Sequence, residues 1–359
     1  MQRFLIVNNF FNISITYGVG FFLLRSISFL LLPIYTNLLN AGDAGIVFII
    51  YTILAFLNPL YTLGMDSALL KFFNSEKYNR QEIVSSSLSA AIFSAFLFSF
   101  FIIMLSQYFN FLLNLAFNSL FFISIMLFFD SISSRLLVLL RLLEKPLYYL
   151  GVGLINILGS VLLNILFLSY YSLGSFGALY ALALISFLQF LCLTPILIKN
   201  LHLHLINFKL IKKMFLFGLP FLPSSLLFII TGMSDRWLIK YYLNLEQVGL
   251  YGAGYKVGSA ISIAVLAFNL SWQPYYLKQY KSKDFHLNIN IISNVFFICL
   301  IFLTTGLSLF WPLLIKININ GYYLIGEAFW KGGVIVPWVA FGYFFLWNVY
   351  ITISFNISL

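Results

Sequence analysis

Apolar runs of about 20 residues recur along the whole chain, and short polar or charged segments separate them. A run of that length forms a helix that can cross roughly 30 Å of hydrocarbon. No polar segment is long enough to fold as a separate soluble domain. The pattern predicts an all-α polytopic membrane protein with about ten transmembrane helices, at 14–38, 45–66, 85–106, 116–140, 147–169, 176–198, 214–242, 249–275, 288–310 and 333–353.

Composition agrees with this pattern, because 62% of the 359 residues are hydrophobic and only 8% are charged. The formal net charge of +10 raises the question of a nucleic-acid partner, but most of the cations lie in loops between apolar runs. We therefore expect no nucleic acid. Cys192 and Cys299 both fall inside apolar runs, where cysteine is usually a small buried hydrophobe. We expect no metal and no resident cofactor.

The distribution of Lys and Arg predicts the orientation of the chain in the membrane. If the N-terminus is cytoplasmic, the inside segments hold 13 cations and the outside loops hold three. Short cationic loops resist translocation, so this bias places the N-terminus in the cytoplasm and the protein in the cytoplasmic membrane.

An internal repeat is visible in the turns that follow the first and seventh predicted helices. "LNAGDAGIVFIIY" (39–51) aligns without a gap on "LNLEQVGLYGAGY" (243–255), with Leu, Asn, Gly and Tyr coinciding at an offset of 204 residues. Six helices separate the two turns, which predicts parallel repeats: a six-helix bundle over 1–200 and a second bundle over 201–359. Two equal halves would need about 410 residues, so we expect the last two of twelve helices to be missing.

Charged residues inside the predicted spans are the candidates for function. A charge at mid-bilayer costs about 2.5 to 3.5 kcal/mol, so each one needs a partner, a wet cavity or a function. Four of the six are cations, and this excess favours an anionic ligand. The six residues are Arg25, Asp130, Arg135, Asp235, Arg236 and Lys256.

Asp235 and Arg236 are adjacent and therefore about 100° apart around a helix, so we do not expect them to pair with each other. Asp235 and Lys256 lie at equal distances from the turn between their helices, which predicts an ion pair between these two. Arg236 either faces a cavity or extends along the membrane toward Lys240. Small residues around Lys256 permit either close helix packing or a cavity.

The other three charges have simpler surroundings. Arg25 shares a helix face with Ser14, Gly18 and Thr36, which predicts that this face lines a polar interior. Asp130 lies near the middle of its helix. Arg135 lies nearer the cytoplasmic end of that helix, where it either faces the interior or extends to the inner headgroups. Asp66, shortly before Lys71, is expected at the membrane interface and not in a site.

Three stretches resemble the polysaccharide transporters, the Wzx-type flippases of O-antigen and capsule repeat units. They are "GVGFFLLRSISFLLLPIYTNLLNAGDAG", "GLPFLPSSLLFIITGMSDRWLIKYYLNLEQVGLYGAGYKVG" and "AFNLSWQPYY". The Asp-Arg pair, the short loop and the following Gly-Leu-Tyr-x-x-x-Tyr-Lys are the most specific part. This family belongs to the multidrug/oligosaccharidyl-lipid/polysaccharide exporter superfamily.

The resemblance implies two helical bundles around a central cationic cavity that moves a polyprenyl-diphosphate-linked oligosaccharide between leaflets. It places Arg25, Asp235, Arg236 and Lys256 at that cavity. We expect Arg25, Arg236 and Lys256 to hold the diphosphate, with Arg135 a weaker candidate. Asp235 and Asp130 would reset the cations or couple transport to H⁺ or Na⁺. Expected partners are the lipid bilayer, a glycan polymerase and the chain-length machinery.

Three other classes stay open at this stage. A membrane glycan polymerase or glycosyltransferase would share the substrate, but the longest outer loop, 311–332, carries one acid, Glu327, which is little material for general acid/base catalysis. A multidrug cation antiporter would need an acid-rich cavity. A truncated, non-transporting fragment is the third alternative.

Overall fold

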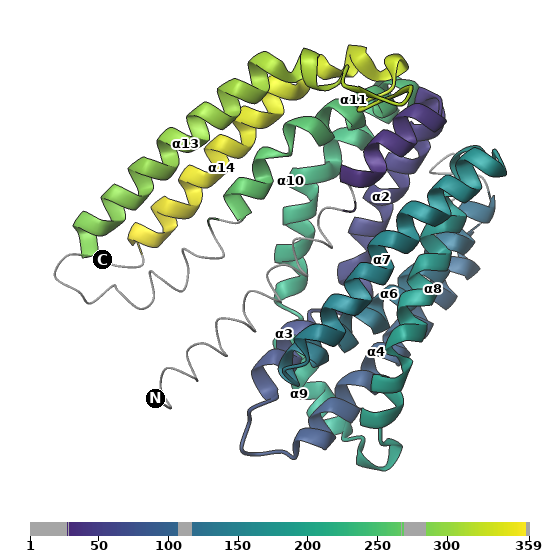
Figure 1. Ribbon diagram of the computed structural model, residues 1–359. Coiled ribbons are helices and arrows are strands. Elements are labelled where there is room, and N and C mark those ends of the chain that lie inside the picture. The colour runs from purple at the N-terminus through teal and green to yellow at the C-terminus, as the bar shows by residue number, and fades with distance from the viewer. Residues whose placement is uncertain (1–26, 28, 107–116, 267, 269–284, 357–359) are drawn as a thin grey trace. The chain divides into compact units, whose positions relative to one another are not determined.

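The computed structural model describes residues 27, 29–106, 117–266, 268 and 285–356 (Figure 1). Eight helical spans in these ranges are long and apolar enough to cross a membrane, and each overlaps a predicted span. The protein is an all-α polytopic membrane protein, as predicted. The eight spans are Ala41–Thr62, Arg80–Met104, Ser119–Leu142, Pro146–Tyr170, Gly174–Asn200, Phe208–Tyr242, Ile291–Leu314 and Glu327–Trp347.

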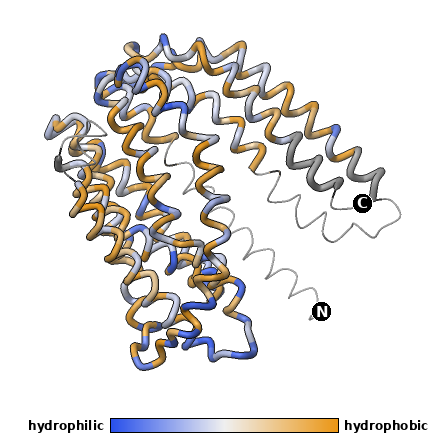
Figure 2. Tube along the Cα trace, turned by 180° about the vertical axis from the view of Figure 1, so that it is seen from behind, coloured by the Kyte–Doolittle hydropathy of each residue, from blue (hydrophilic) through white to orange (hydrophobic). Residues whose placement is uncertain are grey.

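Two of the predicted helices are only partly inside the described residues. The first is described from its second half, where Phe29–Leu38 forms a shorter apolar helix. The eighth begins as α11 (Leu245–Gly258) and turns at residues 259–260 before a further helical segment at 261–266. Hydrophobic residues follow the helices and hydrophilic residues concentrate at the loops, as Figure 2 shows.

Several predicted spans are interrupted where hydropathy gives no sign of it. α2 (Ala41–Thr62) ends at Leu63 and Gly64, which both have positive φ, and the short helix α3 (Met65–Phe72) follows. Residues 214–242 were predicted as one helix, but they contain the end of α9 (Phe208–Gly218) and the whole of α10 (Phe221–Tyr242). Pro220 between them has no N–H to continue a helix.

Two further elements depart from regular α-helix. α7 (Pro146–Ile165) continues into a π-helix at Leu166–Tyr170, and α14 (Val336–Asn356) is preceded by a 3₁₀ helix at Glu327–Ile335.

The chain divides into two compact units. Unit 1 comprises Met1–Ile34 and Ile46–Tyr241, and unit 2 comprises Tyr35–Gly45 and Tyr242–Leu359. The predicted division into bundles of residues 1–200 and 201–359 stays a prediction.

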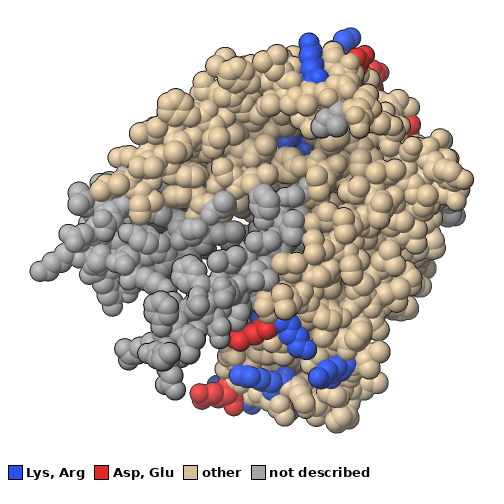
Figure 3. All heavy atoms as spheres, viewed as in Figure 1, with Lys and Arg blue, Asp and Glu red and all other residues tan. Residues whose placement is uncertain are grey.

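In unit 1, α6 (Phe117–Leu142) packs between α4 (Arg80–Met104) and α8 (Gly174–Asn200), and α7 packs on α8. Polar groups inside this bundle satisfy one another. The Tyr61 hydroxyl lies 3.0 Å from Ser99 Oγ, which donates to the Ser124 carbonyl at 3.2 Å. Pairing of this kind is what allows hydroxyl groups to be buried among membrane helices. On the face shown in Figure 3, charged side chains of unit 1 gather at its lower end.

The helices α3 and α9 of unit 1 cross at two glycines. A Cβ on Gly64 would lie 2.2 Å from the Gly218 carbonyl oxygen, and a Cβ on Gly218 would lie 2.7 Å from the Leu63 oxygen. Only glycine permits so close an approach of two backbones. The crossing fixes the start of α3, which carries Asp66.

In unit 2, α13 (Phe285–Leu314) packs along α14, and α11 packs on the 3₁₀ helix. Its core consists of Ile261, Val265, Leu300, Ala340 and Trp347. A two-stranded antiparallel hairpin, β1 (Asn318–Ile319) with β2 (Tyr322–Tyr323), joins α13 to the 3₁₀ helix.

The two repeated turns are built alike and pack together inside unit 2. Asn40 Oδ1 accepts from the Asp43 N–H at 2.7 Å, and Asn244 Oδ1 accepts from the Gln247 N–H at 2.9 Å, so the same residue begins both helices. A Cβ on Gly45 would lie 1.9 Å from the Leu245 oxygen, and a Cβ on Gly249 would lie 2.0 Å from the Ala41 oxygen. Gly249, one of the small residues around Lys256, therefore permits close packing of two backbones.

Candidate functional site

The most deeply buried charge in the described residues is Arg135 of α6, whose exposed fraction is 1%. Its Nε lies 2.9 Å from Asp66 Oδ1, and its other nitrogens donate to Ser87 Oγ at 3.2 Å and to the Thr62 carbonyl at 3.3 Å. Ser134 donates to the other oxygen of Asp66 at 2.8 Å. The guanidinium is thus paired and hydrogen-bonded, which is the condition for burying a charge.

This cluster decides between the two alternatives left open for Arg135 and gives Asp66 a partner. Arg135 does not extend to the headgroups, since its side chain is enclosed by α2, α3, α4 and α6. Asp66 lies in the first turn of α3 and is the counter-charge of Arg135, a contact that the sequence did not predict. The hydropathy pattern placed Asp66 at the end of a membrane span and so missed that α2 ends at Thr62 and a new helix begins at Met65.

Asp130 lies on α6 and is partly buried. Its carboxylate accepts a hydrogen bond from Ser186 of α8, a residue that is itself buried. α6 and α8 therefore meet at a polar contact in the membrane span. Whether Asp130 couples transport to an ion stays a prediction.

Asp235 and Arg236 of α10 form an ion pair with each other, with 3.3 Å between Arg236 Nη1 and Asp235 Oδ1. The prediction that they do not pair was wrong. A helix separates their Cβ atoms by about 100°, but the arginine stem is long enough to fold back along the helix. Arg236 Nη1 also lies 3.4 Å from the Gly232 carbonyl oxygen, one turn earlier.

The sequence left open whether Arg236 faces a cavity or extends toward Lys240, and the direction of its side chain answers part of this question. Its side chain is 10% exposed and folds toward Gly232, so it does not extend along the helix toward Lys240. The N–H of Arg236 also donates to Asp235 Oδ1 at 2.8 Å. This acid–base pair is a compact dipole inside a membrane span, and Asp235 offsets the charge of Arg236.

The remaining candidates lie elsewhere. Lys256 is on α11 in unit 2, half-buried, whereas Asp235 belongs to unit 1, so their pairing stays a prediction. Arg25 lies outside the described residues. Among the described residues, no group of three or more His, Cys, Asp and Glu side chains could hold a metal ion.

Comparison with known proteins identifies the family. The sequence model described as polysaccharide biosynthesis protein matches residues 12–279, about three quarters of the chain. A search of curated proteins finds no match. The resemblance noted in the sequence is thereby confirmed at the level of the family.

Several solved structures share the fold at low sequence identity. An inward-facing multidrug resistance MATE family transporter of the MOP superfamily is 12% identical, with a TM-score of 0.67 over 93% of this chain and 83% of that chain. A MATE protein in the straight conformation is 13% identical, with a TM-score of 0.60 over 96% of both chains.

A third structure is a MOP superfamily transporter from Pyrococcus furiosus, whose binding pocket is described as reversed in polarity. It is 14% identical, with a TM-score of 0.50 over 95% of this chain and 96% of that chain. The fold is thus that of the MATE and MOP transporters, and the chain belongs to the polysaccharide biosynthesis protein family.

Proposed function

We propose that this protein is a flippase that moves polyprenyl-diphosphate-linked oligosaccharides, such as O-antigen or capsule repeat units, across the cytoplasmic membrane. The observation that carries the proposal is the family match over residues 12–279 of a chain whose described part consists largely of membrane-length helices. Every solved structure named above is a transporter or a MATE protein, which favours transport over glycan polymerisation or glycosyl transfer.

The chemistry of the cargo explains why cations inside the membrane are needed. A diphosphate has to leave water to cross the bilayer, and fixed cations in a low-dielectric interior can replace its hydration. We assign this role to Arg25, Arg236 and Lys256. Arg135 is less suited to it, because Asp66, Ser87 and Thr62 already occupy its donors.

The Asp235–Arg236 pair gives the cycle a simple exchange step. Without cargo, the carboxylate holds the guanidinium at 3.3 Å. An arriving diphosphate, which carries more negative charge, competes with Asp235 for Arg236, and Asp235 takes the guanidinium back when the cargo leaves. Alternating access of the two bundles, with Asp130 or Asp235 binding H⁺ or Na⁺, completes the proposed mechanism.

Replacement of Arg236 tests the proposed cation site. In a bacterial strain that lacks its own flippase and depends on this chain for surface glycan, Arg236→Gln should lower export about tenfold or more, because a charge-assisted hydrogen bond is worth about 1.5 to 3 kcal/mol. Lys240→Gln removes a cation one turn away on the same helix and is the matched control.

Protein level in the membrane is measured in the same cells, so that loss of folding is not mistaken for loss of transport. Equal export by both variants at equal protein level would reject Arg236 as a cargo-binding residue. Asp235→Asn should slow export by impairing release of cargo, with lipid-linked glycan remaining bound to the purified protein.

A further inference from the structure

The linker segment between α8 and α10 concentrates positive charge at one end of unit 1. It covers residues 199–217, which are the end of α8, the loop after it and most of α9. It contains no Asp or Glu, and the nearest acids along the chain are Glu144 and Asp235. Its four lysines are Lys199, Lys209, Lys212 and Lys213. The linker segment therefore has no counter-charge of its own.

The depth of the linker segment follows from the length of α10. The 22 residues of α10, at 1.5 Å each, extend about 33 Å, which already exceeds the hydrocarbon core of about 30 Å. Leu219 and Pro220 separate α9 from α10, so α9 lies beyond the hydrocarbon. The linker segment therefore lies at the level of the lipid headgroups.

The helix α9 has a buried face and an outward face. Three residues spaced four apart, Leu210, Met214 and Gly218, are buried where α9 packs on α3 and α4. The residues on the opposite side of the helix form the outward face, and each of them is exposed. They are Phe208, Lys209, Lys212 and Leu216. Apolar side chains and lysines thus share one face.

The apolar part of this surface is large. Phe208 is 80% exposed and Leu216 is 57% exposed, and Leu203 in the loop before α9 is 73% exposed. Exposed apolar groups with charged neighbours mark an interaction surface. The linker segment therefore offers a partner both positive charge and apolar area.

Contacts on the inner side fix the direction of the outward face. Asn207 caps α9, since its Oδ1 accepts from the Leu210 N–H at 3.1 Å, and its amide nitrogen donates to Glu82 Oε1 at 2.6 Å. Lys213 donates to the Tyr78 hydroxyl at 2.8 Å and so lies off the outward face. The cap and these two hydrogen bonds orient α9 without using the lysines of the outward face.

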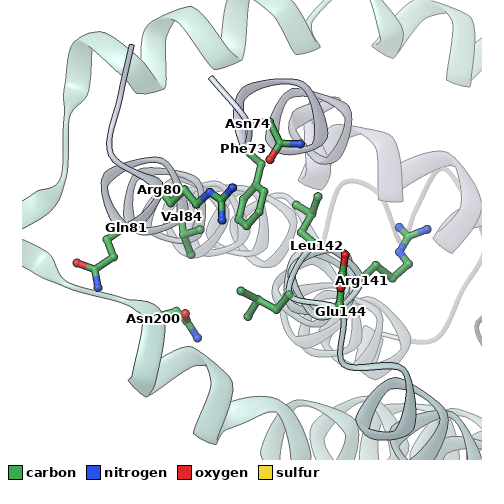
Figure 4. A pocket seen from close by; sticks show the side chains of 10 residues that line it. Phe73, Asn74, Arg80, Gln81, Val84, Arg141, Leu142, Glu144 and Asn200 are labelled. Carbon is green, nitrogen blue, oxygen red and sulfur yellow. The ribbon is translucent and has the colours of Figure 1, made fainter. Parts of the chain in front are cut away.

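A pocket of about 650 Å³ at the same end of unit 1 does not gather cations in this way (Figure 4). The Arg80 guanidinium lies 5.4 Å from the centre of the Phe73 ring, whereas Figure 4 shows the Arg141 guanidinium directed away from Arg80 and from the pocket. We assign no ligand to this pocket. The linker segment is the better match for an anionic partner.

We propose that the linker segment binds the anionic headgroups of the lipid leaflet at its end of unit 1. Phe208 and Leu216 insert between the headgroups, and the ammonium groups of Lys209 and Lys212 contact lipid phosphates. These two lysines form no ion pair in the part of the chain that the structure describes. An acidic soluble protein would match the charge as well, but the depth of α9 favours lipid. The surface takes no part in the proposed transport mechanism, which holds if this proposal fails.

Lipid-specific quenching of a fluorescent label tests the proposal in the full chain. Cys192 and Cys299, the two cysteines of the sequence, are replaced by alanine, and His204→Cys in the linker segment carries a nitrobenzoxadiazole label. The chain is reconstituted in phosphatidylcholine vesicles that contain spin-labelled phosphatidylglycerol or spin-labelled phosphatidylcholine. Each lysine near an anionic surface favours it about fivefold, so the association constant from quenching should be at least about fivefold higher for phosphatidylglycerol.

Paired substitutions locate the source of this preference. Lys209→Gln combined with Lys212→Gln should bring the ratio of the two association constants close to one, and Lys209→Arg combined with Lys212→Arg should preserve it, because arginine keeps the charge. Lys77→Gln combined with Arg141→Gln is the matched control. It removes two exposed cations from the same end of unit 1, outside the linker segment, and should leave the ratio unchanged.

Three results would overturn the proposal. A label that neither lipid quenches would show that the linker segment lies away from the membrane, as expected of a surface for a soluble acidic protein. Equal quenching by the two lipids in the otherwise unsubstituted chain would show that charge does not select the lipid. Equal losses in the two Gln pairs would show that the preference comes from the overall charge of unit 1 and not from the outward face of α9.

Discussion

At the scale of single residues, unit 1 contains a buried charge with partners on three sides. Arg135 contacts Asp66, Ser87 and Thr62, which lie on three other helices. Burying two charges costs several kcal/mol per ion, and the cost is met only when geometry and additional hydrogen bonds are good. The same arrangement makes removal of one partner far more damaging than removal of both.

Substitutions at this pair should show strong coupling. Arg135→Met alone leaves Asp66 without its counter-charge, and Asp66→Leu alone leaves the guanidinium unpaired, so each should lower the free energy of unfolding by about 3 to 5 kcal/mol. The double variant should recover most of this loss. Thermal unfolding in detergent measures the cycle, with Lys199→Gln as a surface control. Additive losses would show that the pair is not the unit of stability.

The sequence identified which charges lie in the membrane, but not their partners. Arg135 and Asp235 stood out because each interrupts an apolar run. Their partners could not be predicted, because Asp66 comes close only through the turn at Gly64, and Arg236 reaches Asp235 through the fold of its own side chain. Hydropathy records the cost of a buried charge and carries no information about side-chain conformation.

At the scale of elements, the repeated turns are the part that the sequence predicted best. The shared Asn and Gly of "LNAGDAG" and "LNLEQVG" perform the same roles in both turns, capping a helix and permitting a backbone contact. The sequence did not predict the breaks between α2 and α3, between α9 and α10, or between the 3₁₀ helix and α14. The mean hydropathy of a membrane span is unchanged when its helix breaks in the middle.

The reciprocal glycine contact predicts two equal effects. Gly45→Ala and Gly249→Ala each place a methyl group about 2 Å from a carbonyl oxygen of the other turn, so each should destabilise the protein by about 2 to 3 kcal/mol. Gly151→Ala in α7 is the matched control, because a Cβ there meets nothing within 4 Å. The free energy of unfolding, measured in detergent, should fall for the Gly45 and Gly249 variants and stay unchanged for the Gly151 variant. An unchanged free energy of unfolding at Gly45 or Gly249 would contradict the close contact between the two turns.

At the scale of the whole molecule, fold class and family followed from sequence patterns that span most of the chain. Membrane-length runs predicted an all-α polytopic protein, and the motifs around residues 231–256 pointed to the polysaccharide transporters. The cargo could not be predicted to the same depth. A diphosphate site needs only a few cations, and many glycans share one lipid anchor. The amino-acid composition therefore carries little information about the sugar.

Lipid movement in reconstituted vesicles tests the central claim most directly. The purified chain is inserted into liposomes that contain a fluorescent prenyl-diphosphate-linked N-acetylglucosamine, and a membrane-impermeant reductant then bleaches whatever label reaches the outer leaflet. A flippase should expose the label that begins in the inner leaflet, and should leave fluorescent phosphatidylcholine protected. Protection of the prenyl-diphosphate label equal to that in protein-free liposomes, or equal exposure of both lipids, would contradict the proposed function.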